Sequence, residues 1–194
     1  MRVSYETIFV MGPQGSGKGT QAKILAEKLG FFYWGMGEIL RSMGEHRFGD
    51  GTTVAGIIDQ GLILPDDKLT SILAAKLPEV PRGKGIIFDG VPRRLGQAKF
   101  LIGWLKEEGR TNPATLFISL SHEESVRRLT LRAKLESRTD DAPEVIAERL
   151  REYQEVTKPM LAYMKENTTF FEIDGMPPVS EVAAAIVKAL EIHD

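Results

Sequence analysis

The chain has 194 residues, 42% of them hydrophobic, and its 25 Lys and Arg against 27 Asp and Glu give a net charge of −2. This length and hydrophobic content predict one domain over residues 1–194, and the balanced charge excludes an overall basic field that would recruit nucleic acid or an anionic membrane. The sequence contains no cysteine, which excludes disulfides, thiolate catalysis and thiolate-ligated zinc.

Short apolar runs alternate along the chain with longer amphipathic segments. The runs that predict strands lie at residues 7–11, 31–34, 85–88, 114–120 and 169–173, and residues 181–190 predict a closing helix with Val182, Ile186 and Ala189 on one face. Such alternation is typical of α/β proteins with a parallel, doubly wound sheet. We therefore expect a three-layer fold with a five-stranded parallel sheet, whose ligands bind beyond the carboxyl ends of the strands.

A glycine-rich loop follows the first predicted strand. Residues 12–20 read Gly-Pro-Gln-Gly-Ser-Gly-Lys-Gly-Thr and lead into helical spacing over residues 21–29. The glycines let backbone N–H groups converge on an anion, the helix N-terminus adds a favourable dipole, and Lys18 supplies a mobile cation. A glycine-rich turn can be only a turn, but the spacing of Gly12, Gly17 and Lys18 and both flanking elements fit a phosphate-binding loop. We expect the chain to bind a nucleoside triphosphate.

The residue after the lysine departs from the general loop pattern. A Ser or Thr that holds Mg²⁺ usually stands there, whereas this chain has Gly19, with Thr20 one residue later. This departure points away from GTPases and motor ATPases.

A second group of charged residues surrounds residue 89. A carboxylate at the end of a buried strand is costly unless it meets a cation, and Asp89 would face the phosphate loop from a neighbouring strand. Hydrated Mg²⁺ is then its natural partner, although an Asp here could also cap a turn. Arg93 offers a planar, charged fork to the phosphate of a second substrate.

Residues 125–151 carry six arginines among many acidic residues. Such a run is usually a solvated helix face. Phosphoryl transfer, however, requires several cations around the transferred group, so both interpretations stay open on composition alone. His46, His122 and His193 fit no catalytic pattern and are expected on the surface.

Five blocks of the sequence, in this order, resemble the adenylate kinases of the nucleoside monophosphate kinase family. They are residues 12–20, 35–41, 60–66, 89–93 and 138–141, with Arg149 beyond the last, and the similarity covers essentially the whole chain. The resemblance implies a P-loop fold with a helical monophosphate-binding insertion and a lid that closes over ATP. It also implies reversible phosphoryl transfer from Mg·ATP to AMP, which gives two ADP.

The resemblance assigns residues to both nucleotides. On ATP it places Gly15, Ser16, Gly17, Lys18, Gly19, Thr20, Arg128, Arg132 and the backbone near Pro177. On AMP it places Met36, Gly37, Arg41, Leu64, Gly90, Arg93, Gln97, Arg138 and Arg149, with Gln97 reading the base by paired hydrogen bonds. Catalysis would fall to Lys18, Arg93, Arg128, Arg138 and Arg149, and Asp89 with Thr20 would hold Mg²⁺ through water.

The resemblance also divides the chain. The core would comprise residues 1–34, 65–131 and 143–194, the monophosphate-binding region residues 35–64, and the lid residues 132–142. Only residues 133–137 separate Arg132 from Arg138, which indicates the short-lid form without zinc. Closure of such a lid would exclude water, because water in the closed site would turn transfer into hydrolysis.

Three departures from the family pattern concern the acceptor base. Met36 stands where Thr is usual, Val91 replaces Phe and Arg94 replaces Thr, so the wall of the AMP pocket is expected to differ in size and charge. Gln97 suits adenine, whereas pyrimidine kinases of the family have Asn there. AMP is therefore the expected acceptor. The alternatives are a UMP or CMP kinase, a non-catalytic nucleotide-binding regulator, and a P-loop hydrolase.

The start of the chain bears on localisation. Residues 1–6 carry no apolar targeting core, and no run approaches membrane-spanning length. We expect a soluble, cytoplasmic monomer whose partners are ATP, AMP and ADP, without nucleic acid or membrane.

Overall fold

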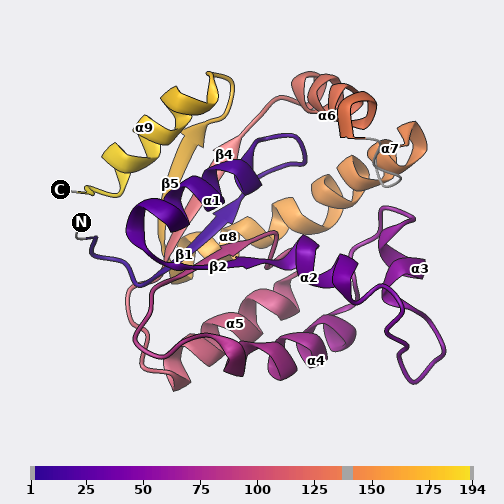
Figure 1. The fold of residues 1–194 in the computed structure, drawn as a ribbon, viewed down its shortest axis with the longest axis horizontal. Coiled ribbons are helices and arrows are strands. Elements are labelled where there is room, and N and C mark those ends of the chain that lie inside the picture. The colour runs from indigo at the N-terminus through magenta and orange to yellow at the C-terminus, as the bar shows by residue number, and fades with distance from the viewer. Residues whose placement is uncertain (1–2, 137–141, 193–194) are drawn as a thin grey trace.

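The computed structural model describes residues 3–136 and 142–192. Within these residues one parallel sheet of five strands has the order β2-β3-β1-β4-β5 (Figure 1). The strands are β1 (Thr7–Met11), β2 (Phe32–Gly35), β3 (Ile86–Asp89), β4 (Ala114–Ser119) and β5 (Thr169–Asp174). The predicted α/β fold with a five-stranded parallel sheet is confirmed.

Several strand boundaries differ from the predictions by one residue. β2 and β3 each lie one residue later than predicted, β4 ends one residue earlier and β5 one residue later. Parallel pairing explains the shifts, since Asp89 pairs with both Gly35 and Val10, and Asp174 pairs with Ser119. Both aspartates are thus the last residues of their strands and lie at the carboxyl edge of the sheet.

Helices cover both faces of the sheet. Alternate residues of β1 divide between them: Ile8 and Val10 pack with α1 (Lys18–Leu29) and α9 (Val179–Ala189), whereas Phe9 and Met11 belong to the opposite core. That second core contains α4 (Asp66–Lys76), α5 (Leu95–Glu107) and α8 (Lys158–Asn167). The closing helix α9 begins and ends slightly earlier than predicted and buries Val182 and Ile186, with Ala189 only partly buried.

The remaining elements are short or lie beyond the sheet. They are α2 (Met36–Ser42), α3 (Val54–Ile58), the 3₁₀ turn η1 (Leu77–Glu79), α6 (His122–Glu136), α7 (Pro143–Glu152) and the π-helical turn η3 (Tyr153–Thr157). In Figure 1, α2, α3, α6 and α7 lie together on the side away from the two chain ends. Two of them, α2 and α6, follow β2 and β4 along the chain and so lie at the carboxyl edge of the sheet.

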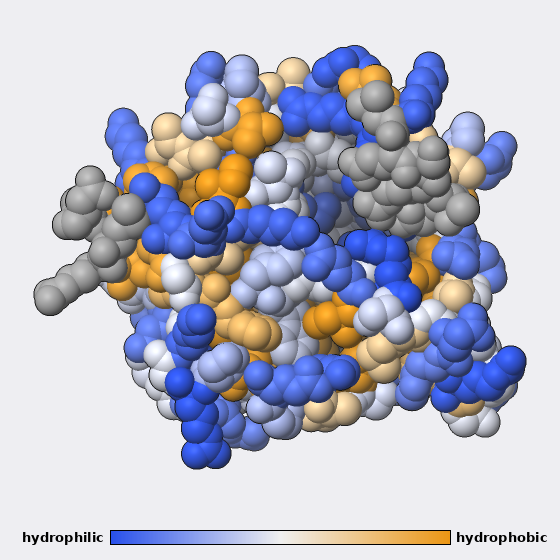
Figure 2. All heavy atoms as spheres, viewed as in Figure 1, coloured by the Kyte–Doolittle hydropathy of each residue, from blue (hydrophilic) through white to orange (hydrophobic). Residues whose placement is uncertain are grey.

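On the face drawn in Figure 2, hydrophobic side chains gather in groups that hydrophilic ones border. Among the helices that the structure describes, none is long and apolar enough to cross a membrane.

Candidate active site

The phosphate loop connects β1 to α1. Gly17 precedes α1 with a φ of 81°, a left-handed conformation that glycine adopts without strain. At Gly12, a Cβ atom would lie 2.4 Å from the carbonyl oxygen of Ile118, so only glycine lets the loop approach β4 this closely. The buried hydroxyl of Ser16 has no hydrogen-bond partner among the described residues. These features are expected of a loop whose backbone N–H groups bind an anion.

Lys18 begins α1 and reaches back across the loop. Its ammonium donates to the carbonyl oxygen of Pro13 at 3.2 Å. Burial lowers the pKa of Lys18 from 10.5 to about 8, although the carboxylate of Asp89 opposes this shift. Three arginines nearby lower the pKa further. Negative charge brought to this point would raise it again, so the local electrostatics favour an anionic ligand.

Arg93 follows β3 and lies close to other charged side chains. Its Nε donates to the carbonyl oxygen of Gly90 at 2.9 Å. Burial lowers the pKa of Arg93 to about 10; the positive charges of Arg149 and Arg41 lower it further, whereas the carboxylate of Asp89 opposes the shift. Arginines from α2, from the β3–α5 loop and from α7 therefore converge closely enough to repel one another. A second anion placed between them would relieve that repulsion.

These groups line one open space of about 450 Å³, which we name the main cleft. The predicted site residues that line it are Gly15, Gly17, Lys18, Gly19, Thr20, Gly37, Arg41, Asp89, Gly90, Arg93, Arg128, Arg132 and Arg149. Ser16 and Pro177 do not line it, and Arg138 lies outside the described residues. The cleft thus joins the phosphate loop to the second group of arginines without a break.

A narrower space of about 70 Å³, the side pocket, opens beside the main cleft. The predicted residues that line it are Met36, Gly37, Arg41, Leu64, Gly90, Arg93, Gln97 and Arg149. Its other walls are mostly apolar and include Leu40, Ile58 and Leu69. Because the two spaces share Gly37, Arg41, Gly90, Arg93 and Arg149, the cations stand where they meet. This arrangement suits a ligand with an apolar ring and a phosphate.

Gln97 is completely buried in the side-pocket wall, where its amide binds the backbone. Its Oε1 accepts from the N–H groups of Arg93 and Arg94 at 2.8 and 3.3 Å, and its Nε2 donates to the carbonyl oxygen of Leu64 at 3.2 Å. One Nε2 hydrogen therefore remains for a ligand. In this conformation the side chain offers a base one hydrogen bond rather than the expected pair.

Of the three departures expected to alter this wall, only Met36 lines the side pocket. Val91 is buried in the main core, and Arg94 donates to Glu152 at 3.4 Å. The reason is that Arg94 directly precedes α5, where its side chain reaches the end of α7 instead of the pocket. The expectation that Val91 and Arg94 form the pocket wall is therefore wrong.

Arg128 and Arg132 both belong to α6 and lie one helical turn apart, as predicted. Arg128 donates to the carbonyl oxygens of Gly175 and Met176 at 2.9 and 3.1 Å, and also to Glu124 at 2.7 Å. It thereby ties α6 to the loop between β5 and α9, which continues into Pro177. Arg128 itself lines the main cleft, whereas Gly175, Met176 and Pro177 do not.

The donor groups near the loop fit magnesium. A Cβ atom on Gly19 would lie 3.1 Å from Oδ2 of Asp89, so this carboxylate does face the phosphate loop as predicted, and exposed Thr20 lines the same cleft. Within the described part of the chain, no three His, Cys, Asp or Glu side chains form a site for a metal ion by themselves. Mg²⁺ suits such a place, since it keeps most of its water and binds through one or two protein groups plus substrate phosphates. His46 and His122 are exposed, and His193 lies outside the described residues.

The sequence prediction missed several lining residues. In the main cleft these are Gln14, Lys23, Tyr33, Glu38 and Leu129, and in the side pocket Leu40, Ile58, Gly61, Leu62, Ile63 and Leu69. Leu40 could have been found, because it is three residues after Gly37 and therefore on the same face of α2. Ile58 and Leu69 carry no local pattern that separates a pocket wall from a core position.

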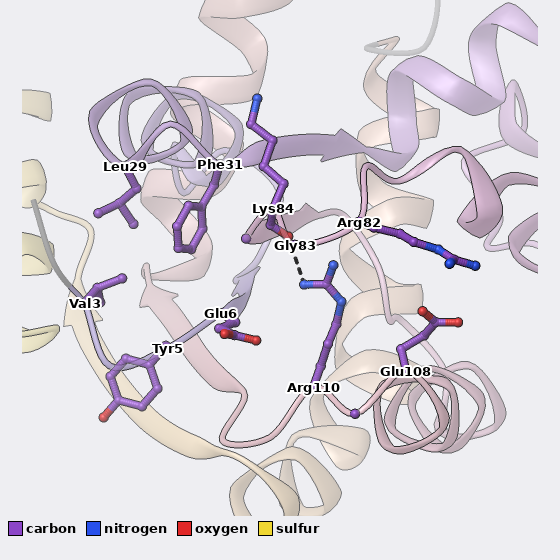
Figure 3. A pocket seen from close by; sticks show the side chains of 12 residues that line it. Val3, Tyr5, Glu6, Leu29, Phe31, Arg82, Gly83, Lys84, Glu108 and Arg110 are labelled. Carbon is purple, nitrogen blue, oxygen red and sulfur yellow. Dashed lines mark hydrogen bonds between the residues drawn. The ribbon is translucent and has the colours of Figure 1, made fainter.

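A larger hollow of about 660 Å³ lies at the opposite edge of the sheet (Figure 3). Its lining comes from segments that precede β1, β2, β3 and β4, and it mixes the bases Arg82, Lys84 and Arg110 with the acids Glu6 and Glu108. Figure 3 shows Arg82 and Lys84 pointing in different directions. We name this space the amino-edge hollow. It contains no part of the phosphate loop.

Comparison with known proteins identifies the family of the chain. Residues 10–169 match the family model of adenylate kinase. The chain is 37% identical over 187 residues to an adenylate kinase from Thermus thermophilus, covering 96% of this chain and 98% of the relative. It is also 36% identical over 184 residues to one from Phocaeicola vulgatus (95% and 97% covered) and 34% identical over 185 residues to one from Caulobacter sp. (95% and 98% covered). Because these matches cover nearly the full length of this chain and of each relative, the chain belongs to the adenylate kinase family and is a phosphotransferase.

Proposed function

We propose that the chain transfers the terminal phosphoryl group of Mg·ATP reversibly to AMP, which gives two ADP. The observation that carries this proposal is the continuity of the main cleft, which runs from the phosphate loop to a second group of cations at the side pocket. A hydrolase or a simple ATP binder needs the loop alone. Arg41, Arg93 and Arg149 would instead bind a second phosphate that lies opposite the first.

The chemistry requires positioning and charge more than covalent work from the protein. An oxygen of the AMP phosphate is already ionised, so it attacks the γ-phosphorus without a general base, and the bond to the β–γ bridging oxygen breaks. On the ATP side we assign phosphate contacts to Gly15, Ser16, Gly17, Lys18, Gly19, Thr20, Arg128 and Arg132. On the AMP side we assign them to Arg41, Arg93 and Arg149. The proposal also assigns Arg138 to catalysis and to the AMP phosphate, and it places a short lid at residues 132–142.

Magnesium, when bound, would neutralise charge on the β- and γ-phosphates of ATP. Asp89 and Thr20 would hold it through its water shell, and their place beside Gly19 supports this role. The acceptor base would occupy the side pocket among Met36, Leu64 and Gln97, within a monophosphate-binding region at residues 35–64.

Measuring ADP formation with Mg·ATP and, separately, AMP, UMP, CMP, GMP or no acceptor tests the proposal. Turnover with AMP alone is expected. Preference for UMP or CMP would show that Met36 has changed the base pocket despite Gln97, and loss of ATP without acceptor would indicate a hydrolase. Tight ATP binding without turnover would favour a regulatory binder.

A further inference from the structure

Tyr33, in the strand next to β3, contacts the carboxylate that faces the phosphate loop. Its hydroxyl donates to Oδ2 of Asp89 at 3.0 Å. This is the same oxygen that a Cβ atom on Gly19 would approach to 3.1 Å. Tyr33 therefore holds the oxygen of Asp89 that lies nearest the loop, and Tyr33 itself lines the main cleft.

Gly35 makes this contact possible. In the β2–β3 register, Gly35 pairs with Asp89 while Tyr33 pairs with Ile87, so the phenol must extend along β2 past Gly35 to reach the carboxylate. A Cβ atom on Gly35 would lie 2.7 Å from both Cε1 and the hydroxyl oxygen of Tyr33. Any larger residue at position 35 would displace the end of the ring. The sequence thus supplies a donor at position 33 and the space for it at position 35.

A lysine ammonium lies over the ring of Tyr33. Nζ of Lys23 lies 5.3 Å from the centre of the Tyr33 ring, and the same ammonium pairs with Glu38 at 2.6 Å. The contacts with Lys23 and Asp89 thus fix both the ring and the hydroxyl of Tyr33.

We propose that Tyr33 is a positioning residue that fixes the Asp89 carboxylate toward the water shell of the magnesium ion on the donor phosphates. This inference rests on the proposed function. Mg²⁺ requires nearly ideal octahedral geometry, so a carboxylate that can rotate serves its water shell poorly. The hydrogen bond from Tyr33 removes that rotation before the nucleotide arrives, while the remaining lone pairs of Asp89 stay available to water.

The test compares Tyr33→Phe with Tyr5→Phe, the same change at the amino-edge hollow. Calorimetry gives the affinity for β,γ-imido-ATP with Mg²⁺ and with EDTA, and the ratio of the two measures what magnesium adds. For Tyr33→Phe we expect unchanged affinity in EDTA and a gain from magnesium that is about tenfold smaller, the usual effect of losing an outer-shell partner. Tyr5→Phe should behave as the parent. An unchanged ratio in Tyr33→Phe would overturn the proposal.

A second variant tests the same contact while keeping the hydroxyl. Gly35→Ala should displace the end of the ring and reduce the gain from magnesium similarly, and the double variant with Tyr33→Phe should lose no more than either single one. Additive losses would contradict the role assigned to Gly35. Because this readout is binding, it stays decisive even if the parent protein transfers no phosphate to AMP, a result that would reject the proposed function separately.

Discussion

The cavities at the two edges of the sheet show that volume alone does not identify the functional site. The amino-edge hollow measures about 660 Å³ and the main cleft about 450 Å³, and both contain several basic residues. In the hollow, Arg82 and Lys84 are exposed and stand among acidic residues. In the cleft, Lys18 and Arg93 have pKa values lowered by burial and by neighbouring arginines.

The difference is one of preorganisation. Buried cations that converge on one cleft raise the free energy of the unliganded protein, and an anion that binds there removes this cost. Exposed cations that point apart are already solvated by water and gain little from a ligand. We therefore expect matched substitutions at the two edges to differ widely in their effect on phosphoryl transfer.

The largest difference is expected between Lys18→Ala and Lys84→Ala. Lys18 contacts the loop that would hold the transferring phosphates, and its loss should lower kcat by about 10⁴-fold or more, within the range for a cation that stabilises phosphoryl transfer. Lys84→Ala should keep the rate of the parent. Steady-state ADP formation measures both, and comparable rates in the two variants would remove Lys18 from the chemistry.

Arg93→Ala against Arg82→Ala gives the next largest difference. Arg93 lines the main cleft and the side pocket, so its loss should lower kcat/KM for AMP by about 10³-fold while ATP binding stays nearly intact. Arg82→Ala should alter neither quantity. Kinetics with AMP and calorimetry with ATP separate the two effects, and a rate near that of the parent for Arg93→Ala would reject a phosphate-binding role.

The two halves of the site differ in how far the sequence predicted them. The phosphate loop lies within residues 12–20, so its strand, glycines and lysine could be read as one local pattern. The side pocket takes residues from α2, α3, α4, α5 and α7, and the packing of Ile58 and Leu69 into one wall follows from the tertiary fold alone. Tyr33 was missed for the same reason, because its partner Asp89 is 56 residues away.

The fold itself was predictable because alternation of apolar runs and amphipathic segments is repeated along the whole chain. Strand boundaries were less certain, since pairing rather than composition decides where a strand ends, as Gly35 and Asp89 show. Arg94 illustrates a further limit. Because Arg94 stands where Thr is usual in the family, it was expected in the pocket wall, but the start of α5 directs it to Glu152.

Gln97→Ala and Arg110→Ala extend the comparison to stability. The side chain of Gln97, a buried residue, makes three hydrogen bonds to the backbone, whereas Arg110 donates one, at 3.0 Å, to the carbonyl oxygen of Lys84 in the amino-edge hollow. Removing Gln97 leaves buried groups unpaired and should lower the free energy of unfolding by about 3 kcal/mol, against less than about 1 kcal/mol for Arg110. Urea unfolding measures both, and equal losses would show that the side-pocket wall does not depend on this amide.

The smallest expected effect is the pH dependence that the lowered pKa of Lys18 causes. Lys18 has a pKa of about 8 in the folded chain against 10.5 ordinarily, so between these values the folded state binds fewer protons than the unfolded state. Between pH 8 and pH 10.5 the contribution of Lys18 to the free energy of unfolding therefore rises with pH. Below pH 8 the folded state still carries the full destabilisation from the buried ammonium, and above pH 10.5 this destabilisation is gone.

Binding of ATP should reverse this shift, because its phosphates favour the charged ammonium. At pH 8.5, above the lowered pKa of Lys18, the protein should take up more of a proton on binding ATP than at pH 7, where the ammonium is already mostly charged. Calorimetry in two buffers with different ionisation enthalpies gives the proton uptake directly. Lys84→Ala should leave the uptake unchanged and Lys18→Ala should abolish it. If proton uptake at pH 8.5 persists in Lys18→Ala, a group other than Lys18 is protonated when ATP binds, and the pKa of Lys18 is not the cause of the uptake.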